Sequence, residues 1–386
     1  MDTKTKTQTY IANTYGRFDV VAVKGKGSLI TDENGKEYID LGSGIAVNSF
    51  GVANDEWVKA ITEQASSLQH SSNLYYTKPG ADLAEALCTR TGMKKVFFSN
   101  SGAEANECAI KVARKWAADN KGSDCFTIIT LENSFHGRTI TTLAATGQEV
   151  FHKDFTPLTE GFVQAKANDI ESVKEAVKNN KVAAVMMEAV QGEGGVVPLT
   201  ADFVKEVVSL AEEENFLVIF DEVQTGNGRS GKLYAYMNFG VTPDIVSTAK
   251  GLAGGLPLGA TLLGEKVKDT LKPGMHGSTF GANPVCSAAA LSVLSRIDDK
   301  LLAEIKEKSD YVFETLSGKP GIEGVTGMGL MIGIKTAKDA SEVVAKCQEN
   351  GVLVLKAKDK VRLLPALNIP FDLLKKAVSV IEEAAK

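Results

Sequence analysis

Residues 217–231 read LVIFDEVQTGNGRSG, an apolar run that ends in two acids and a glycine-rich loop. The run has the length and composition of a buried strand, so Asp221 and Glu222 stand at its carboxyl end. Carboxylates are seldom core residues, and the Gly, Asn, Arg and Ser that follow are not core residues either. The stretch therefore predicts a strand that carries polar groups to the edge of a buried sheet.

The middle of the chain repeats this pattern of apolar runs, separated by helical patterns. Residues 104–120 place Ala109, Ala113 and Trp116 on one helical stripe, and residues 201–215 form a similar stripe. Continuous apolar strands that alternate with helices indicate an α/β fold, with a mostly parallel sheet covered on both faces. The expected strands are residues 95–100, 126–133, 183–190, 217–223, 245–250 and 260–265.

The two ends of the chain predict a second, smaller domain. Residues 1–50 hold short β-like pieces, and ENGK at residues 33–36 is a good hairpin signal. A turn-rich stretch near residue 276 precedes a long helical pattern, two β-like runs and a closing helix. We expect residues 51–275 to form the large domain and residues 276–386 a small α+β domain, which the segment 1–50 joins.

Composition narrows the class of protein. The chain of 386 residues is 44% hydrophobic and 24% charged, which is ordinary for a globular protein with a sizeable core. Its formal charge of −5 gives no general attraction to nucleic acid or to an anionic membrane. No apolar run is long enough to span a bilayer, and the polar start is unlike a secretory signal. Five widely spaced cysteines without a C-x-x-C pair favour a reducing cytoplasm, and the four histidines show no zinc-binding pattern.

Polar groups follow most of the expected strands. Ligands of open α/β sheets bind beyond the carboxyl ends of the strands. Three of the runs lead into the loops SGAEAN, SFHGR and QGEGG, and two others end in Asp221 and Lys250. Because five strand ends carry such groups, and the carboxyl ends of the strands meet at one edge of the sheet, we expect a single site there.

The loop SNSGAEAN, residues 99–106, precedes a helix. Free amides at a helix start, where Ser101 and Gly102 allow close approach, suit an anion. A plain N-cap is the commoner role for Ser101 alone, and a lone Lys250 more often extends to solvent. Together, Lys250 for a Schiff base, Asp221 for a pyridinium nitrogen and a phosphate cup match the needs of pyridoxal phosphate. A structural Asp–Lys salt bridge would not need the cup.

Two arginines and one acid suggest a site for carboxylates. Arg362 interrupts the apolar run KVRLLPAL, which indicates a buried, paired guanidinium, and Glu193 in QGEGG is a plausible partner. Arg138 could bind a carboxylate, although most arginines are solvated, and Phe135 could stack on a flat ring or pack in the core. GNGRSGK, residues 226–232, resembles a phosphate-binding loop but lacks the Ser or Thr that binds magnesium, so we expect no nucleotide there.

Taken together, these residues resemble the class III pyridoxal-phosphate-dependent aminotransferases. The resemblance spans nearly the whole chain and rests on FFSNSGAEANE, SFHGRT, QGEGG, DEVQTGNGRSG, AKGLAGGLPLGA and HGSTFGANP. It implies a fold-type-I transferase, in which the large domain binds the cofactor and the small domain is α+β. It also implies a homodimer with shared active sites.

The resemblance assigns roles to residues at matching positions. Lys250 and Asp221 are implied to be catalytic: Lys250 joins the cofactor covalently and moves a proton, and Asp221 pairs with the ring nitrogen. Thr279 is implied to reach the phosphate from the other subunit. The positions implied to bind the cofactor are Ser101, Gly102, Ala103, Phe135, Asp221, Gln224, Lys250 and Thr279. Those implied to bind substrate are Arg138, Ser278, Glu193 and Arg362, with Glu193 neutralising Arg362 until 2-oxoglutarate binds.

The implied reaction moves the distal amino group of N-acetylornithine to 2-oxoglutarate and releases glutamate, as a step of arginine biosynthesis. Succinylornithine, ornithine, 4-aminobutyrate and succinyldiaminopimelate stay open as alternative substrates. A pyridoxal-phosphate aminomutase would not need two arginines. A non-enzymatic binding protein of this fold would lack the lysine or the aspartate, and both are present.

Overall fold

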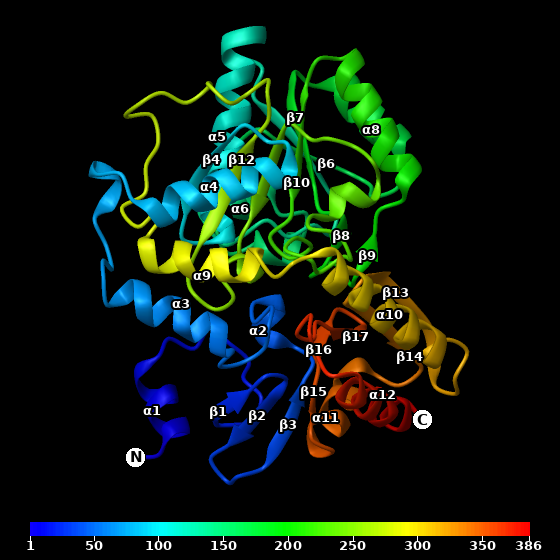
Figure 1. The fold of residues 1–386 in the computed structure, drawn as a ribbon. Helices are drawn as coiled ribbons and strands as arrows, with labels where there is room; N and C mark the ends of the chain where they lie inside the picture. The colour runs from blue at the N-terminus through cyan, green and yellow to red at the C-terminus, as the bar shows by residue number, and fades with distance from the viewer.

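The computed structural model describes residues 1–386 and centres on a seven-stranded sheet (Figure 1). The strand order is β4-β12-β11-β10-β7-β5-β6. Strand β12 runs antiparallel to both of its neighbours, and the other pairings are parallel, which confirms the expected mostly parallel sheet. The strands are β4 (Lys95–Ser99), β5 (Thr127–Leu131), β6 (Phe162–Ala165), β7 (Val182–Met187), β10 (Leu217–Asp221), β11 (Ile245–Thr248) and β12 (Gly259–Leu263).

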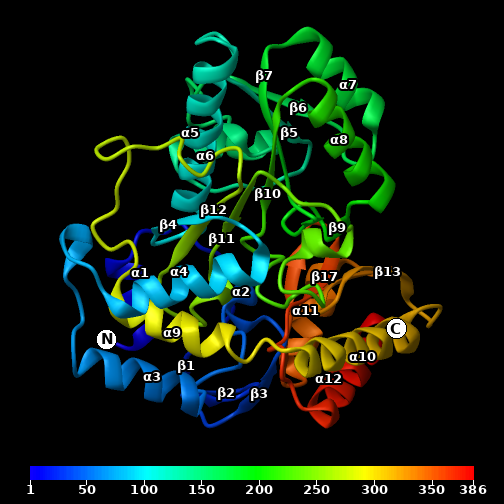
Figure 2. The same ribbon diagram turned by 45° about the horizontal axis from the view of Figure 1, so that its top comes forward.

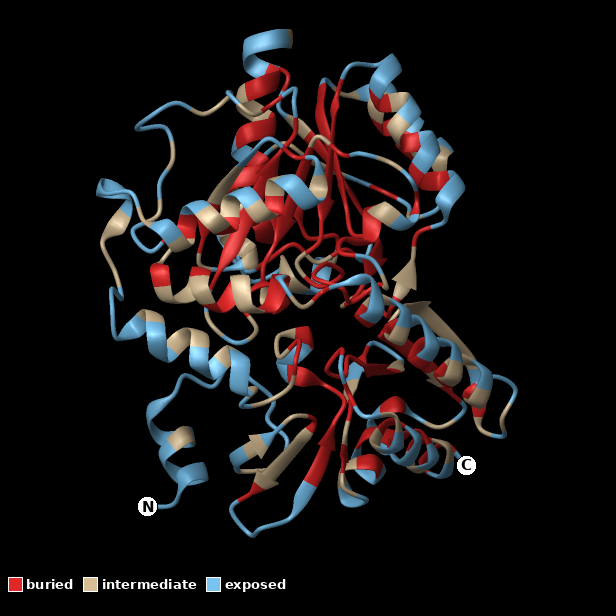
Figure 3. Cartoon of the chain, viewed as in Figure 1, coloured by how far each residue is buried: buried red, intermediate tan, exposed pale blue.

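Helices cover both faces of this sheet, and Figure 3 shows its strands buried between them. In β10, Leu217 and Ile219 face the core beneath α5 (Gly102–Lys121), while Val218 and Phe220 face the opposite core. Alternate residues of a strand point to opposite faces, so a strand covered on both sides is apolar throughout. Among the helices that pack in the opposite core are α4 (Lys78–Thr91), α7 (Ile170–Asn179) and α8 (Ala201–Glu213). The predicted stripe of α5 is buried: Ala105, Ala109, Val112, Ala113 and Trp116.

The edge strand β6 is the strand of this sheet that the sequence pattern does not predict. Its four residues, FVQA, are buried only at Ala165, because β6 pairs with β5 on one side alone. A short, partly exposed edge strand needs neither a long apolar run nor a strict alternation, so it leaves a weak signal.

Two smaller sheets and a second core lie at the other end of the molecule (Figure 1). One sheet has the order β1-β2-β3-β15 and the other β13-β14-β17-β16. The hairpin expected at ENGK joins β2 to β3, with Gly35 at a φ of +84°. The strands are β1 (Ala22–Lys26), β2 (Leu29–Asp32), β3 (Glu37–Asp40), β13 (Ile322–Met328), β14 (Met331–Thr336), β15 (Val352–Leu353), β16 (Leu355–Ala357) and β17 (Lys360–Leu363), and a separate two-stranded ladder pairs β8 (Val190–Gln191) with β9 (Val197–Pro198).

The remaining helices are divided between the large sheet and the two smaller ones, and no helix of the chain has both the length and the apolar character that a membrane-spanning helix needs. One of them, α2, is a single turn with left-handed backbone angles. They are α1 (Thr3–Tyr10), α2 (Ser43–Ala46), α3 (Asp55–Ala65), α6 (Ile140–Ala145), α9 (Pro284–Leu294), α10 (Asp299–Leu316), α11 (Ala340–Glu349) and α12 (Phe371–Ala385).

We keep the division at residues 50 and 275 as a proposal. In its favour, Ile39 and Leu41 from the N-terminal segment pack in the second core with α10, α11 and α12. Helix α9 is an argument for a later boundary. It lies beside α3 and α4 in both ribbon views (Figures 1 and 2), and Ala290 and Val293 belong to the core of the large sheet.

Candidate active site

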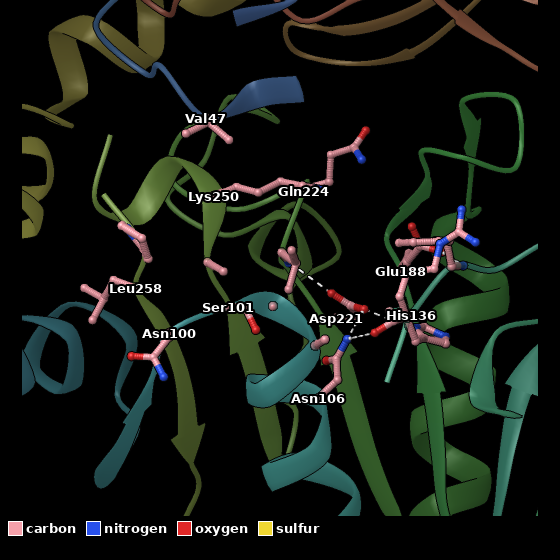
Figure 4. A pocket seen from close by; sticks show the side chains of 18 of the residues that line it. Val47, Asn100, Ser101, Asn106, His136, Glu188, Asp221, Gln224, Lys250 and Leu258 are labelled. Carbon is pink, nitrogen blue, oxygen red and sulfur yellow. Dashed lines mark hydrogen bonds and ion pairs between the residues drawn. The ribbon is translucent and has the colours of Figure 1, made fainter. Parts of the chain in front are cut away.

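A cavity of about 440 Å³ opens where β4, β10 and β11 end and α5 begins (Figure 4). Each of these strands delivers polar residues there because their carboxyl ends lie at the same edge of the sheet. Of the predicted site residues, those that line the cavity are Ser101, Gly102, Ala103, Phe135, Arg138, Asp221, Gln224 and Lys250. The other four, Glu193, Ser278, Thr279 and Arg362, lie outside its lining and are described below.

The start of α5 forms one wall of the cavity. Ser101 caps the helix, because its Oγ accepts a hydrogen bond from Glu104 N at 3.2 Å, and its carbonyl accepts from Ala105 N at 3.0 Å. The amides of Gly102 and Ala103 lie in the first turn, where the helix offers no carbonyl partner, and both residues face the cavity. A methyl group on Gly102 would lie 2.6 Å from Val223 Cγ1, so glycine allows the helix to approach the loop after β10.

Asp221 is locked in place at the bottom of the cavity (Figure 4). Its Oδ2 accepts a hydrogen bond from Asn106 Nδ2 at 2.8 Å and lies 2.8 Å from His136 Nδ1, while its Oδ1 accepts from Val223 N at 3.0 Å. Asn106 also donates to the carbonyl of His136 at 2.7 Å. We call Asn106, His136 and Asp221 the floor of the site; all three are 1–3% exposed.

Glu188 supports the floor from the end of β7. Its carboxylate accepts hydrogen bonds from Phe135 N at 2.9 Å and from Gly192 N at 3.3 Å. Burial raises the pKa of Glu188 to about 7, and the charge of Asp221 adds to this effect while His136 opposes it. One side chain therefore holds both the loop of Phe135 and the loop that leads to Glu193.

Sequence reasoning missed three of these residues: Asn106, His136 and Glu188. Two of them left a signal. Asn106 lies on the buried stripe of α5, where a polar side chain needs a partner, and Glu188 interrupts the fully buried run AVMMEAV. His136 left no signal beyond its place beside Phe135.

Lys250 lies two residues after the end of β11 and reaches the cavity from the side opposite to the floor (Figure 4). Burial lowers the pKa of its amine below the ordinary value of 10.5, although the carboxylates of Glu193 and Asp221 oppose that shift. A lysine with a lowered pKa is more often uncharged and is then a nucleophile or a base.

Glu193, Gln224 and Arg362 form a cluster that we call the rim. Arg362 Nη1 donates to Glu193 Oε1 at 2.6 Å and to Gln224 Oε1 at 3.2 Å, and Gln224 Nε2 donates to Glu193 Oε1 at 3.3 Å. The paired guanidinium expected at Arg362 is thus present, with a side chain 3% exposed against 31% for Glu193. Burial alone would raise the pKa of Glu193, but the charge and the hydrogen bond of Arg362 outweigh it and lower that pKa.

Phe135 and Arg138 form the outer wall. The guanidinium carbon of Arg138 lies 4.1 Å from the centre of the Phe151 ring and 5.6 Å from the centre of the Phe135 ring. Arg138 is exposed, and Phe135 is half-buried. The arginine is therefore held by aromatic faces and leaves its donors free for a ligand.

Ser278 and Thr279 stand apart from the cavity. Ser278 Oγ accepts a hydrogen bond from Asn100 Nδ2 at 3.3 Å, and Thr279 is exposed. Met275 and Phe280, close to them in sequence, are also exposed. So are Tyr75 and Tyr76, which follow Asn73, whose Nδ2 donates to Ser278 O at 3.3 Å.

The run GNGRSGK is a structural turn. Arg229 is 2% exposed, and its Nη1 donates to the carbonyls of Leu330 and Pro365, which ties the loop after β10 to the chain around the smaller sheets. Burial lowers the pKa of Arg229 to about 9. No cluster of His, Cys, Asp and Glu side chains is arranged to hold a metal ion.

Residues 10–385 match the class-III aminotransferase family, so the chain belongs to that family of pyridoxal-phosphate-dependent enzymes. A curated relative, acetylornithine aminotransferase of Haemophilus ducreyi, is 48% identical over 97% of this chain and 96% of its own. The crystal structure of ornithine aminotransferase from Toxoplasma gondii matches with a TM-score of 0.95 at 32% identity, over 99% of this chain and 94% of that one. An amine transaminase from an uncultivated Pseudomonas species, solved with pyridoxal phosphate bound, matches with a TM-score of 0.91 at 27% identity, over 97% of each chain. These structures confirm the fold-type-I architecture.

The residues of the cavity fit pyridoxal phosphate. The cavity offers an amine, a fixed carboxylate, two amides at a helix start and an aromatic face. Its volume lies in the range of small-molecule sites. Buried His136 Nε2 and Asn106 Oδ1 have no partner within the protein, which leaves polar atoms for a bound group.

Proposed function

We propose that this chain transfers the distal amino group of N2-acetyl-L-ornithine to 2-oxoglutarate, giving N-acetyl-L-glutamate 5-semialdehyde and L-glutamate. The observation that carries the proposal is the ion pair of Glu193 with Arg362, joined through Gln224 to the cavity. Identity supports the choice of substrate, because the chain is 48% identical to an acetylornithine aminotransferase and 32% identical to an ornithine aminotransferase. The pathway served would be arginine biosynthesis in the cytoplasm.

The residues that would hold pyridoxal phosphate follow the ends of four strands, β4, β5, β10 and β11. The amides of Gly102 and Ala103, with Ser101, would bind the phosphate, since a helix start attracts anions. Phe135 would cover one face of the ring. Gln224 would donate to the phenolic oxygen of the ring, and Lys250 would bear the covalent link.

Bound pyridoxal phosphate supplies a ring that accepts electrons when a carbon of the substrate loses its proton. Lys250 Nζ would remove that proton and return it to a neighbouring carbon. Its lowered pKa favours this role, because a base works best when its pKa lies near the working pH.

Asp221 would keep a proton on the ring nitrogen. Asn106 and His136 fix the orientation of its carboxylate, and Val223 N holds its second oxygen. A carboxylate that is already oriented needs no rearrangement during the reaction, which increases its electrostatic effect.

The rim would allow two substrates of different length to use one pocket in turn. Arg138, with free donors at the outer wall, would bind the carboxylate of the amine donor. Glu193 neutralises Arg362 in the structure, so an amine donor would meet no unpaired positive charge there. When 2-oxoglutarate binds, Glu193 would release Arg362, whose planar guanidinium suits the α-carboxylate.

The active unit would be a homodimer with shared sites. Thr279 is exposed and lies outside the cavity of its own chain, so it would contribute to the phosphate site of the other subunit. Ser278 would contact substrate from the same loop. The exposed aromatic residues Tyr75, Tyr76 and Phe280 support a covered surface here.

The test is a comparison of kcat/KM for acetylornithine, succinylornithine, ornithine, 4-aminobutyrate and succinyldiaminopimelate, with 2-oxoglutarate as acceptor. The purified protein should be yellow and should bleach when the amine donor is added. We expect acetylornithine to give the highest kcat/KM. If another amine gave the highest kcat/KM, the choice of substrate would be wrong. A protein that stayed colourless and inactive after pyridoxal phosphate was added would overturn the whole proposal.

A further inference from the structure

The backbone at Lys250 has an unusual conformation. Lys250 has a φ of +45°, in the left-handed region that residues other than glycine seldom occupy. Ala249 before it has a φ of −165° and a ψ of −140°. Such conformations persist where surrounding contacts hold them, and they are frequent in active sites. The contacts that hold this one are visible on both sides of Lys250.

Asn227 holds the carbonyl before Lys250. Its Nδ2 donates to Ala249 O at 3.2 Å and to Thr248 Oγ1 at 3.0 Å. The same carbonyl accepts from Leu252 N at 2.9 Å, which closes the short turn that begins at Lys250. Asn227 is 3% exposed, so water does not compete for these hydrogen bonds.

Ser49 holds the carbonyl of Gly251, the residue after Lys250. Its Oγ donates to Gly251 O at 3.0 Å, and the residue is 2% exposed. Ser49 is itself fixed, because its carbonyl accepts a hydrogen bond from Leu367 N at 2.8 Å. The contact therefore brings the N-terminal segment and the chain after β17 against the peptide that joins Gly251 to Leu252.

Gly251 shows how tightly the two residues meet. A methyl group at Gly251 would lie 2.7 Å from Ser49 Oγ and 3.5 Å from Asn227 Cβ. Glycine thus leaves just enough room for Ser49 and Asn227 to converge on the turn that carries Lys250.

We propose that Ser49 and Asn227 are positioning residues that clamp the carbonyls of Ala249 and Gly251, the residues before and after Lys250, and so direct the lysine amine into the cavity. This inference rests on the proposed role of Lys250 as the residue that bears pyridoxal phosphate. Neither side chain lines the cavity, so both act through the backbone of Lys250. Loss of one clamp would let a peptide rotate and would displace the amine.

The test uses Ser49→Ala and Asn227→Gly in the full-length enzyme. Glycine suits position 227 because Asn227 has a φ of +56°, so this change removes the donor without adding backbone strain. Should Asn227→Gly fail to fold, Asn227→Asp keeps the shape of the side chain and removes the same donor. The matched control is Ser287→Ala, because Ser287 is fully buried and its Oγ has no hydrogen-bond partner.

Three measurements apply to each variant: kcat and KM, the melting temperature, and the rate at which cofactor-free protein takes up pyridoxal phosphate into an adduct that borohydride fixes at Lys250. We expect kcat and the uptake rate to fall about tenfold in each clamp variant, with KM for the amine donor within about twofold, since small displacements of reacting groups are costly. Ser287→Ala should match the wild type in kcat and uptake rate.

The outcomes separate the two proposals. If the wild-type protein forms no adduct at Lys250, the proposed function itself fails. If the wild type forms the adduct and turns over, but the clamp variants keep the kcat and uptake rate of Ser287→Ala, the clamp is overturned. A change confined to the melting temperature would also overturn it, because a merely structural contact would affect unfolding and not the position of Lys250.

Discussion

The floor and the rim of the site are built in different ways. Of the floor residues, Asp221 ends β10, Asn106 lies on α5 and His136 lies on the loop between β5 and α6, so all three come from the large domain, and each is almost fully buried. The rim joins Glu193, on a loop after β8, to Arg362 on β17 of a smaller sheet, and Glu193 is 31% exposed. The floor is thus fixed within one core, whereas the rim spans two.

This difference suits the two tasks of the site. A group that keeps one proton in place throughout a reaction benefits from a rigid surrounding. A group that must hide and then expose a positive charge needs a partner that can leave, and Glu193, whose side chain is 31% exposed, can move away when a substrate carboxylate takes its place beside the buried Arg362. The floor should therefore respond to mutation through kcat, and the rim through the choice between substrates.

The largest effect is expected from Lys250→Ala, because both the covalent link and the mobile proton depend on this amine. We expect kcat to fall by at least about a thousandfold. The matched control is Lys232→Ala, which removes the exposed lysine of the GNGRSGK turn. Steady-state assays decide: a Lys250→Ala variant that turned over at the wild-type rate would exclude Lys250 from the chemistry.

Asp221→Asn tests the rigid floor. The variant keeps the shape of the side chain but loses the negative charge, so we expect kcat to fall by about 100- to 1,000-fold with a smaller change in KM. The control is Asp244→Asn near the amino end of β11, where Asp244 Oδ2 accepts from Val218 N at 2.9 Å. Equal losses of activity in the two variants would indicate a general structural effect and would contradict the role given to the floor.

Glu193→Gln tests the movable rim. Removal of the negative charge leaves the charge of Arg362 uncompensated, so the amine donor meets an unpaired positive charge while 2-oxoglutarate meets a free partner. We expect KM for acetylornithine to rise about tenfold and KM for 2-oxoglutarate to stay level or fall. Single-turnover measurements of the two half-reactions provide the check, and Glu213→Gln, at an exposed position, is the control. An equal change in both half-reactions would contradict the proposed release of Arg362 by Glu193.

The smallest effect concerns Glu222, which neighbours the floor but faces away from the cavity. Burial raises its pKa to about 7 from the ordinary 4.5, while Thr225 and backbone amides oppose the shift. The folded protein therefore holds a proton that the unfolded chain releases between pH 4.5 and pH 7, and stability from this group is lost as pH rises through that window. Glu222→Gln mimics the protonated form, because its amide can donate to Thr225 Oγ1 and its oxygen can accept from Tyr236 N.

We expect Glu222→Gln to match the wild type in stability near pH 5 and to exceed it near pH 8, by about 1–3 kcal/mol. Urea unfolding at both pH values measures the difference. A constant difference across this range would show that Glu222 is already ionised in the folded protein.

Much of the fold, and the presence of Asp221 and Lys250 in the site, could be predicted from the sequence. Asp221 and Lys250 end apolar runs, and such runs become strands whose carboxyl ends meet. The supporting contacts could not be predicted in this way. Glu188 holds the amides of Phe135 and Gly192, which are 53 and 4 residues away, and only the folded sheet brings these groups together.

The rim shows the same limit. The position of Arg362 in an apolar run predicts that the guanidinium is paired, and the contact with Glu193 confirms it. The hydrogen bonds of Gln224 to both partners have no sequence signal, because Gln224, Glu193 and Arg362 lie on three separate loops and strands. The need of a buried arginine for a partner can be predicted from that residue alone, whereas the geometry of the pair depends on the whole fold.

The antiparallel strand β12 sets the distance between two parts of the site. Because β12 lies between β4 and β11 and runs against both, these two strands point the same way and end two strand spacings apart, which is roughly 10 Å. One end leads to the start of α5 and the other to Lys250. A ligand that contacts both the Lys250 amine and the amides at the start of α5 therefore lies across the amino end of β12, where Pro257 and Leu258 line the cavity.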